Sequence, residues 1–165
     1  MHISLMCCKC ARLYVPLNFI LLTFMSVLYG IGFGSMSARM STYIVFAALG
    51  LTVAIVAVLT IVAALPCFDM TGWGIYLCFA GIGLVTFGSV ALILGMVFRL
   101  RIMFLVYSIL ITVIYSLYLI YDTQLILGGR KYEISSEEYI VGTVCLYTDF
   151  IYIFLALMNI INCMQ

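Results

Sequence analysis

The sequence predicts an all-α membrane protein, a polytopic bundle of about five transmembrane helices in a single domain over residues 1–165. Hydrophobic residues make up 67% of the chain and charged residues 8%, whereas soluble domains carry about 25% charged residues. The few charges are clustered, so that long uncharged stretches lie between them. Only helices and closed barrels satisfy their backbone polar groups in lipid, and these long stretches lack the alternation of barrel strands.

The charged residues set the bounds of each expected helix. No charge occurs between Arg12 and Arg39, between Arg39 and Asp69, or between Asp69 and Arg99. Two later apolar stretches each carry a single internal carboxylate. Each stretch provides the about 20 residues that a helix needs to cross a bilayer. We expect helices over residues 16–36, 42–65, 73–97, 103–127 and 139–163.

A hydrophilic connection, GGRKYEISSEE, separates the last two expected helices. Gly128 and Gly129 are residues of the kind that end a helix. Ser135 and Glu138 form an S-x-x-E capping box ahead of the next apolar run, which predicts the start of a helix. Basic residues are divided four against three between the two faces, so the positive-inside rule favours a cytosolic N-terminus only slightly.

The N-terminal segment contains three cysteines, Cys7, Cys8 and Cys10. Cysteines beside a membrane helix can be palmitoylated, which is one interpretation; the alternative is that they have no special role. Zinc would require about four ligands, and His2 is the only histidine in the chain. The following apolar stretch is too long for a signal peptide and lacks a small-residue cleavage site, so we expect a retained helix.

Two carboxylates, Asp122 and Asp149, lie inside the last two apolar stretches. A charged side chain at the centre of a membrane helix costs about 2.5–3.5 kcal/mol on insertion scales, which makes such a residue a candidate for function. Helical periodicity places Tyr115 and Tyr118 on the same face as Asp122, where they are accessory candidates. The same count places Glu138 on the face of Asp149, as a third carboxylate near the start of that helix.

If the two aspartates meet, they cannot both ionise cheaply in a low-dielectric setting and would titrate as one unit. Such a pair can share a proton, pair with an arginine or bind a hard cation. Calcium takes about six to eight oxygen ligands, so Asp122 and Asp149 favour a weak, proton-sensitive cation site over a tight one. The alternative is that each aspartate forms a satisfied contact with a tyrosine hydroxyl and only fixes helix packing.

Other classes of function find little support in the sequence. The lone histidine and the lack of a phosphate-binding loop argue against an enzyme and against a bound cofactor. A net charge of +1 does not indicate a nucleic-acid partner. Small residues, which allow helices to approach closely, favour ordinary packing; they include Gly30 and Gly34, in a GxxxG pattern, and Gly81, Gly83, Gly88 and Gly95.

The stretch YDTQLILGGRKYEISSEEYIVGTVCLYTDFIYIF, residues 121–154, resembles the C-terminal pattern of the Bax-inhibitor (TMBIM) superfamily, in its lifeguard and glutamate-receptor-associated branch. The ordered elements are D-T-Q-L followed by G-x-R, then S-x-E-E-Y-I, then L-Y-x-D. PLN at residues 16–18 and FDMT at residues 68–71 also resemble family positions. The likeness extends over most of the chain from about residue 7.

The resemblance implies the C-terminal part of a seven-helix fold, without its first two helices. It implies an endoplasmic-reticulum or Golgi protein, with the plasma membrane as a further location, that regulates calcium homeostasis and suppresses apoptosis. It also implies that Asp122 and Asp149 form a pH-responsive gate, with calcium as the permeant ion. The gate's basic partner in the family has no counterpart here, so the alternative is a non-conducting regulator that contacts membrane-protein partners or a full-length relative through its helices.

Overall fold

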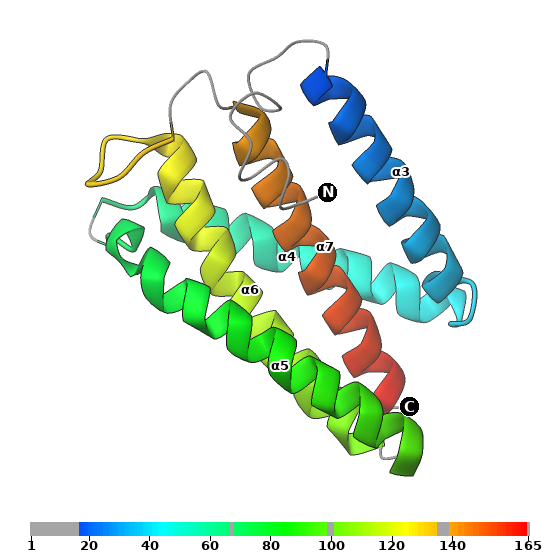
Figure 1. Cartoon of the computed structure of the whole chain (residues 1–165). Helices are drawn as coiled ribbons and strands as arrows, with labels where there is room; N and C mark the ends of the chain where they lie inside the picture. The colour runs from blue at the N-terminus through cyan, green and yellow to red at the C-terminus, as the bar shows by residue number, and fades with distance from the viewer. Residues whose placement is uncertain (1–16, 67, 99–100, 135–138, 165) are drawn as a thin grey trace.

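Long helices make up nearly all of the part of the chain that the computed structural model describes, which is residues 17–66, 68–98, 101–134 and 139–164. This confirms the predicted fold class, an all-α bundle of apolar helices (Figure 1). A short 3₁₀ turn, η1 (Thr71–Trp73), precedes the third of them. The helices are α3 (Leu17–Ser37), α4 (Thr42–Ala64), α5 (Gly74–Phe98), α6 (Arg101–Leu127) and α7 (Tyr139–Met164).

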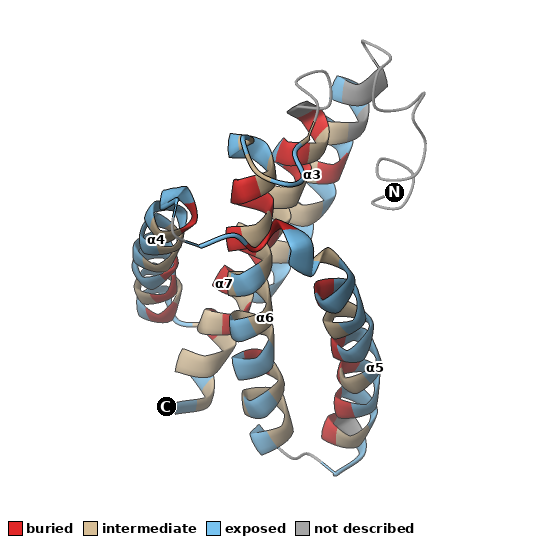
Figure 2. Ribbon diagram, turned by 90° about the vertical axis from the view of Figure 1, so that its left-hand side faces the viewer, coloured by how far each residue is buried: buried red, intermediate tan, exposed pale blue. Residues whose placement is uncertain are grey.

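Helix α7 lies at the centre of the bundle. It packs most extensively on α6, while α4 packs against both of them, α5 lies along α6, and α3 touches α7 (Figure 1). Half of the apolar span of α7 is buried (50%), against 11–22% for α4, α5 and α6. Figure 2 shows the same pattern, with the buried residues of the outer helices turned inward. Functional groups on α6 and α7 are therefore placed in the interior.

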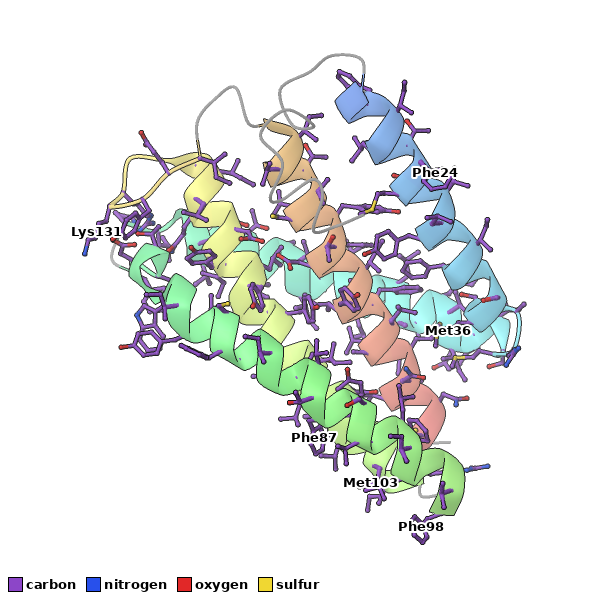
Figure 3. The ribbon with its side chains drawn as sticks, in the orientation of Figure 1. Phe24, Met36, Phe87, Phe98, Met103 and Lys131 are labelled. Atoms are coloured by element: carbon purple, nitrogen blue, oxygen red, sulfur yellow. The ribbon has the colours of Figure 1, made fainter. Side chains whose placement is uncertain are left out.

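The outward faces of the helices are apolar. Phe24 of α3 is 53% exposed and Phe98 of α5 is 64% exposed, and both project away from the bundle (Figure 3). Helices that are hydrophobic on every side are typical of membrane spans. Helices α4 to α7 are long and apolar enough to cross a bilayer, and Leu22–Ser37 of α3 is a shorter apolar helix. The chain is an integral membrane protein whose outer surface contacts lipid.

A buried amide fastens the end of α4 to α6. Gln124 of α6 is fully buried. Its Oε1 accepts a hydrogen bond from the backbone N–H of Met70 at 2.7 Å, and its Nε2 donates to the carbonyls of Phe68 at 2.9 Å and Ala63 at 3.3 Å. Backbone groups at a helix end have no partner within their own helix. Gln124 supplies that partner where water does not reach.

Arg130 binds the same carbonyls from the connection that follows α6. Its guanidinium donates to the carbonyls of Phe68 at 2.6 Å, Leu65 at 2.8 Å and Ala63 at 3.0 Å. A positive charge at the C-terminal end of a helix also complements the helix dipole. Gln124 and Arg130 together, which we call the α4 clamp, join the two connections on this face of the bundle.

The turn after α6 is formed as the sequence predicts. Gly128 and Gly129 have φ angles of 68° and 69°, a left-handed conformation that glycine adopts without strain. The N–H of Gly128 donates to the carbonyl of Gln124 at 3.2 Å, which closes the end of the helix. The predicted capping box of Ser135 and Glu138 lies outside the described residues.

Asp69 sits in the other connection on this face, before η1. Its Oδ1 accepts hydrogen bonds from the hydroxyl of Thr71 at 2.7 Å and from the backbone N–H of Thr71 at 2.9 Å. These two bonds, with a smaller contribution from the charge of Arg130, hold the pKa of Asp69 below its usual value. Asp69 is thus a charged residue of the turn, separate from the acidic residues of the membrane spans.

A row of glycines on α5 accommodates aromatic rings of α6. The row repeats every seventh residue, and a Cβ added at any of the four positions would fall within 3.0 Å of an aromatic side chain. Close packing was expected at three of these glycines, whereas Gly83, also expected to pack closely, has nothing within 4 Å of the Cβ position. The facing pairs are Gly74 with Tyr121, Gly81 with Tyr118, Gly88 with Tyr107, and Gly95 with Phe104.

Substitution of Gly88 by alanine should therefore destabilise the bundle. The added Cβ would lie 2.6 Å from Cζ of Tyr107 and force the ring to move, and overpacking of this kind costs about 1–3 kcal/mol. Gly83→Ala is the matched control, because its Cβ meets open space and alanine is the better helix former. Thermal unfolding in detergent should show a lower unfolding temperature for Gly88→Ala and no such decrease for Gly83→Ala. Equal stability of the two variants would contradict the packing described.

Candidate functional site

The two aspartates meet inside the bundle. Asp122 lies five residues before the end of α6 and Asp149 ten residues into α7, which are depths of about 7.5 Å and 15 Å at 1.5 Å per residue. The antiparallel helices nevertheless bring the carboxyls into hydrogen-bonding contact. Asp149 is 3% exposed and Asp122 is 9% exposed. Two carboxylates repel each other and a carboxyl needs a proton to donate, so this contact predicts a pair that holds a proton.

A thiol completes the immediate surroundings of the pair. The Cys145 side chain, one turn before Asp149 on α7, hydrogen-bonds to the Asp122 carboxyl. The second oxygen of Asp149, Oδ2, is buried and has no hydrogen-bond partner. A buried acceptor without a partner is unfavourable by about 1–3 kcal/mol. The site is therefore only partly satisfied by the described residues.

The acidic pair lines a cavity of about 550 Å³ between α5 on one side and α6 and α7 on the other. The α5 wall runs from Gly74 to Thr86, which is about 18 Å along a helix. Among the described residues that line the cavity there is no lysine or arginine. The lining consists of Gly74, Cys78, Gly81, Ile82, Val85 and Thr86 of α5, Tyr115, Tyr118 and Asp122 of α6, and Cys145, Thr148 and Asp149 of α7.

Tyrosines surround the pair and link four helices. The Tyr118 hydroxyl donates to the Leu77 carbonyl of α5 at 2.7 Å. Tyr115 stacks on Tyr152 of α7 with ring centroids 4.5 Å apart. Tyr152 in turn hydrogen-bonds with Tyr29 of α3, which also contacts Thr148. Helices α3, α5, α6 and α7 are thus joined around the acidic pair by hydroxyl groups and stacked rings.

Of the predicted site residues, the structure brings four together in one cavity: Asp122, Asp149, Tyr115 and Tyr118. Neither tyrosine is shown bonded to an aspartate, since the Tyr118 hydroxyl is directed to Leu77. Glu138 and the cysteines Cys7, Cys8 and Cys10 lie outside the described residues. Among the residues that the structure describes, no cluster of three or more metal-binding side chains is present; calcium at the aspartate pair therefore stays a prediction.

Sequence reasoning gave no role to several residues that shape the site. Gln124 lies two positions after Asp122 in an otherwise apolar helix. A second polar residue in such a helix is the signal that could have identified it. The bond from Cys145 to Asp122 could be anticipated only in part, because periodicity places Cys145 on the face of Asp149 but says nothing of the neighbouring helix. Gly74 extends the glycine row by one repeat of seven residues, and this spacing in the sequence could have identified it.

Comparison with known proteins identifies the family of the chain. The family described as "Inhibitor of apoptosis-promoting Bax1" matches residues 1–165. Mouse protein lifeguard 3 is 34% identical over 168 aligned residues, 98% of this chain and 52% of that protein, and human protein lifeguard 3 is 37% identical over 93% of this chain and 49% of its own length. Protein LIFEGUARD 4 of Arabidopsis thaliana is 31% identical over 88% of this chain and 57% of its own length.

The fold and the site define the class of protein: an integral membrane helix bundle with a pair of carboxyls buried against its central helix. Within this class, the chain belongs to the Bax-inhibitor family, in the neighbourhood of its lifeguard members. It spans about half the length of the curated relatives that it matches.

The contact between Asp122 and Asp149 predicts a protonated carboxylic acid in the folded protein at neutral pH. Infrared difference spectra between the wild type and Asp122→Asn/Asp149→Asn should show the C=O stretching band of a protonated acid, lost in the variant. Asp69→Asn, which removes an exposed carboxylate from the connection, should leave that band in place. A spectrum without the band in correctly folded protein would contradict a proton-sharing pair.

Proposed function

We propose that this chain forms a pH-sensitive pathway for calcium leak from an intracellular store and, through it, restrains apoptosis. Family membership supports this role, because the family is described as an inhibitor of apoptosis-promoting Bax1. The observation that carries the proposal is the contact of Asp122 and Asp149 within a cavity of the bundle. The protein would act as a channel-like regulator and not as an enzyme, with calcium as the permeant ion and no resident cofactor.

Protonation provides the gating step. With one proton between them, Asp122 and Asp149 attract each other and hold the facing surfaces of α6 and α7 together. Loss of that proton leaves two negative charges in contact, where the low dielectric strengthens their repulsion. The separated carboxylates would then provide oxygen ligands for a hard cation in transit. Few ligands favour brief binding, as a leak pathway requires.

The location follows from the same family resemblance. We propose the membrane of the endoplasmic reticulum or Golgi, with the α4 clamp and the connection after α6 on the cytosolic side. Lys131 of that connection is exposed and lies at the edge of the bundle (Figure 3), as the positive-inside rule favours for a cytosolic loop.

Calcium entry into dye-loaded liposomes that contain the purified chain tests the proposal. Flux should be larger at pH 8 than at pH 6, because the higher pH favours loss of the shared proton. Asp122→Asn/Asp149→Asn should abolish this pH dependence, since amides do not titrate, while Asp69→Asn should retain it as the matched control. Correctly inserted wild-type protein without any flux, or with a flux that the double variant reproduces, would rule out the gate.

A second candidate function is a non-conducting regulator that binds other membrane helices. Gly30 and Gly34 of α3 are exposed, and nothing lies within 4 Å of the Cβ position of either. Small residues four positions apart on a free face allow a second helix to approach closely. Helix α3 also has the weakest contacts with the rest of the bundle. These observations favour α3 as the contact surface.

Leucine at both Gly30 and Gly34 should therefore reduce co-purification with a tagged, longer family member in detergent. Gly50→Leu on α4 is the matched control, because Gly50 is also exposed with open space around it. Asp149→Asn should leave the association unchanged, which separates this function from conduction. Unaltered co-purification of the Gly30→Leu/Gly34→Leu variant would eliminate α3 as the contact surface.

A further inference from the structure

The cavity beside the acidic pair has the size and the chemistry of a small-molecule site. Its volume of about 550 Å³ falls within the range of about 300–1,000 Å³ that is usual for ligand pockets. Such pockets combine mostly apolar walls with a few convergent polar groups. Here Ile82, Val85 and the ring of Tyr115 supply apolar wall, and the two carboxyls supply the polar end.

One buried oxygen of a residue that lines this cavity lacks a partner. Asp149 is 97% buried, as its 3% exposure implies, yet its Oδ2 accepts no hydrogen bond. The hydroxyl of Tyr118 is committed to Leu77, and the thiol of Cys145 to Asp122. The described residues that line the cavity include no cation that could complete the pair. A ligand with N–H donors would provide what the oxygen lacks.

The charge of the pair selects among cations. Two carboxyls that share one proton carry a single negative charge, which a monovalent ammonium group neutralises while leaving that proton in place. A divalent ion would first have to displace the proton and would then find few oxygen ligands. An ammonium group has three N–H donors, and the faces of Tyr115 and Tyr118 can add a cation–π contribution.

We propose that this cavity binds a primary ammonium group carried on an apolar body, with the ammonium at Asp122 and Asp149 and the body along α5. The site goes beyond the proposed calcium leak and does not require that the chain conduct ions. Its bound ligand would hold the carboxyl pair and the α5 wall together. The walls of the cavity set the size of the apolar body, and the single charge of the pair sets the valence of the head group.

Dansylcadaverine is a suitable probe, since a short methylene chain joins its ammonium group to an aromatic group. Trp73, the one tryptophan of the chain, lies directly before Gly74 of the cavity wall and can transfer excitation energy to the dansyl group. Binding to the full chain in nanodiscs should give saturable energy transfer. N-pentyl dansylamide, which lacks the amine, should bind at least about tenfold more weakly, equivalent to 1.4 kcal/mol.

Two sets of variants complete the test. Asp122→Asn/Asp149→Asn should weaken the binding of dansylcadaverine at least about tenfold and leave the binding of the neutral probe unchanged. Val85→Phe should obstruct the cavity and reduce binding without touching the acids, whereas Val90→Phe, on the same helix but outside the cavity, should not; neither variant adds a second tryptophan donor. Equal binding of the two probes, or amine binding that survives both the Asn variant and Val85→Phe, would overturn the proposal. Loss of calcium flux with saturable amine binding retained would overturn only the leak.

Discussion

Nothing in the hydrocarbon core of a bilayer hydrates a polar group, so a polar atom that enters it without a partner on the protein is unfavourable. The described bundle is arranged around that constraint. Gln124 reaches the unpaired backbone groups at the end of α4, the Tyr118 hydroxyl reaches a carbonyl of α5, and Asp122 reaches Asp149. Lipid is as apolar as leucine, so these polar contacts and close packing specify how the helices associate.

The polar contacts divide the bundle into a firmly joined part and a more lightly joined one. Hydrogen bonds from Gln124 and Arg130 connect α4 and the segment after it to α6 and the segment after it, and α6 packs along α7. Helix α5, by contrast, rests on α6 through ring-to-glycine contacts and the hydrogen bond from the Tyr118 hydroxyl to the Leu77 carbonyl. The cavity lies between α5 and the pair of helices α6 and α7, so a change in the charge of the acidic pair acts directly on the interface with fewer hydrogen bonds.

The sequence was sufficient for features that depend on one helix at a time. Long uncharged stretches predicted the membrane bundle, and Gly128 and Gly129 predicted the turn, because burial and backbone conformation are local properties. Periodicity placed Tyr118 with Asp122, but it could not reveal that the hydroxyl binds Leu77, which depends on the packing of α5. The α4 clamp was missed for the same reason: Gln124 and Arg130 bind carbonyls that any residue at those positions would present. The roles of Asp122 and Asp149 as a gate stay a prediction.

The α4 clamp has a consequence for the order in which the protein is made. The donors on Arg130 lie 65 to 67 residues after the α4 carbonyls at Leu65 and Ala63 that they bind. During synthesis, α4 therefore enters the membrane before Arg130 exists to bind the carbonyls at its C-terminal end. These carbonyls stay without the guanidinium until the whole of α5 and α6 has been added. Assembly of this face is then a late event, completed when the segment that leads into the central helix leaves the ribosome.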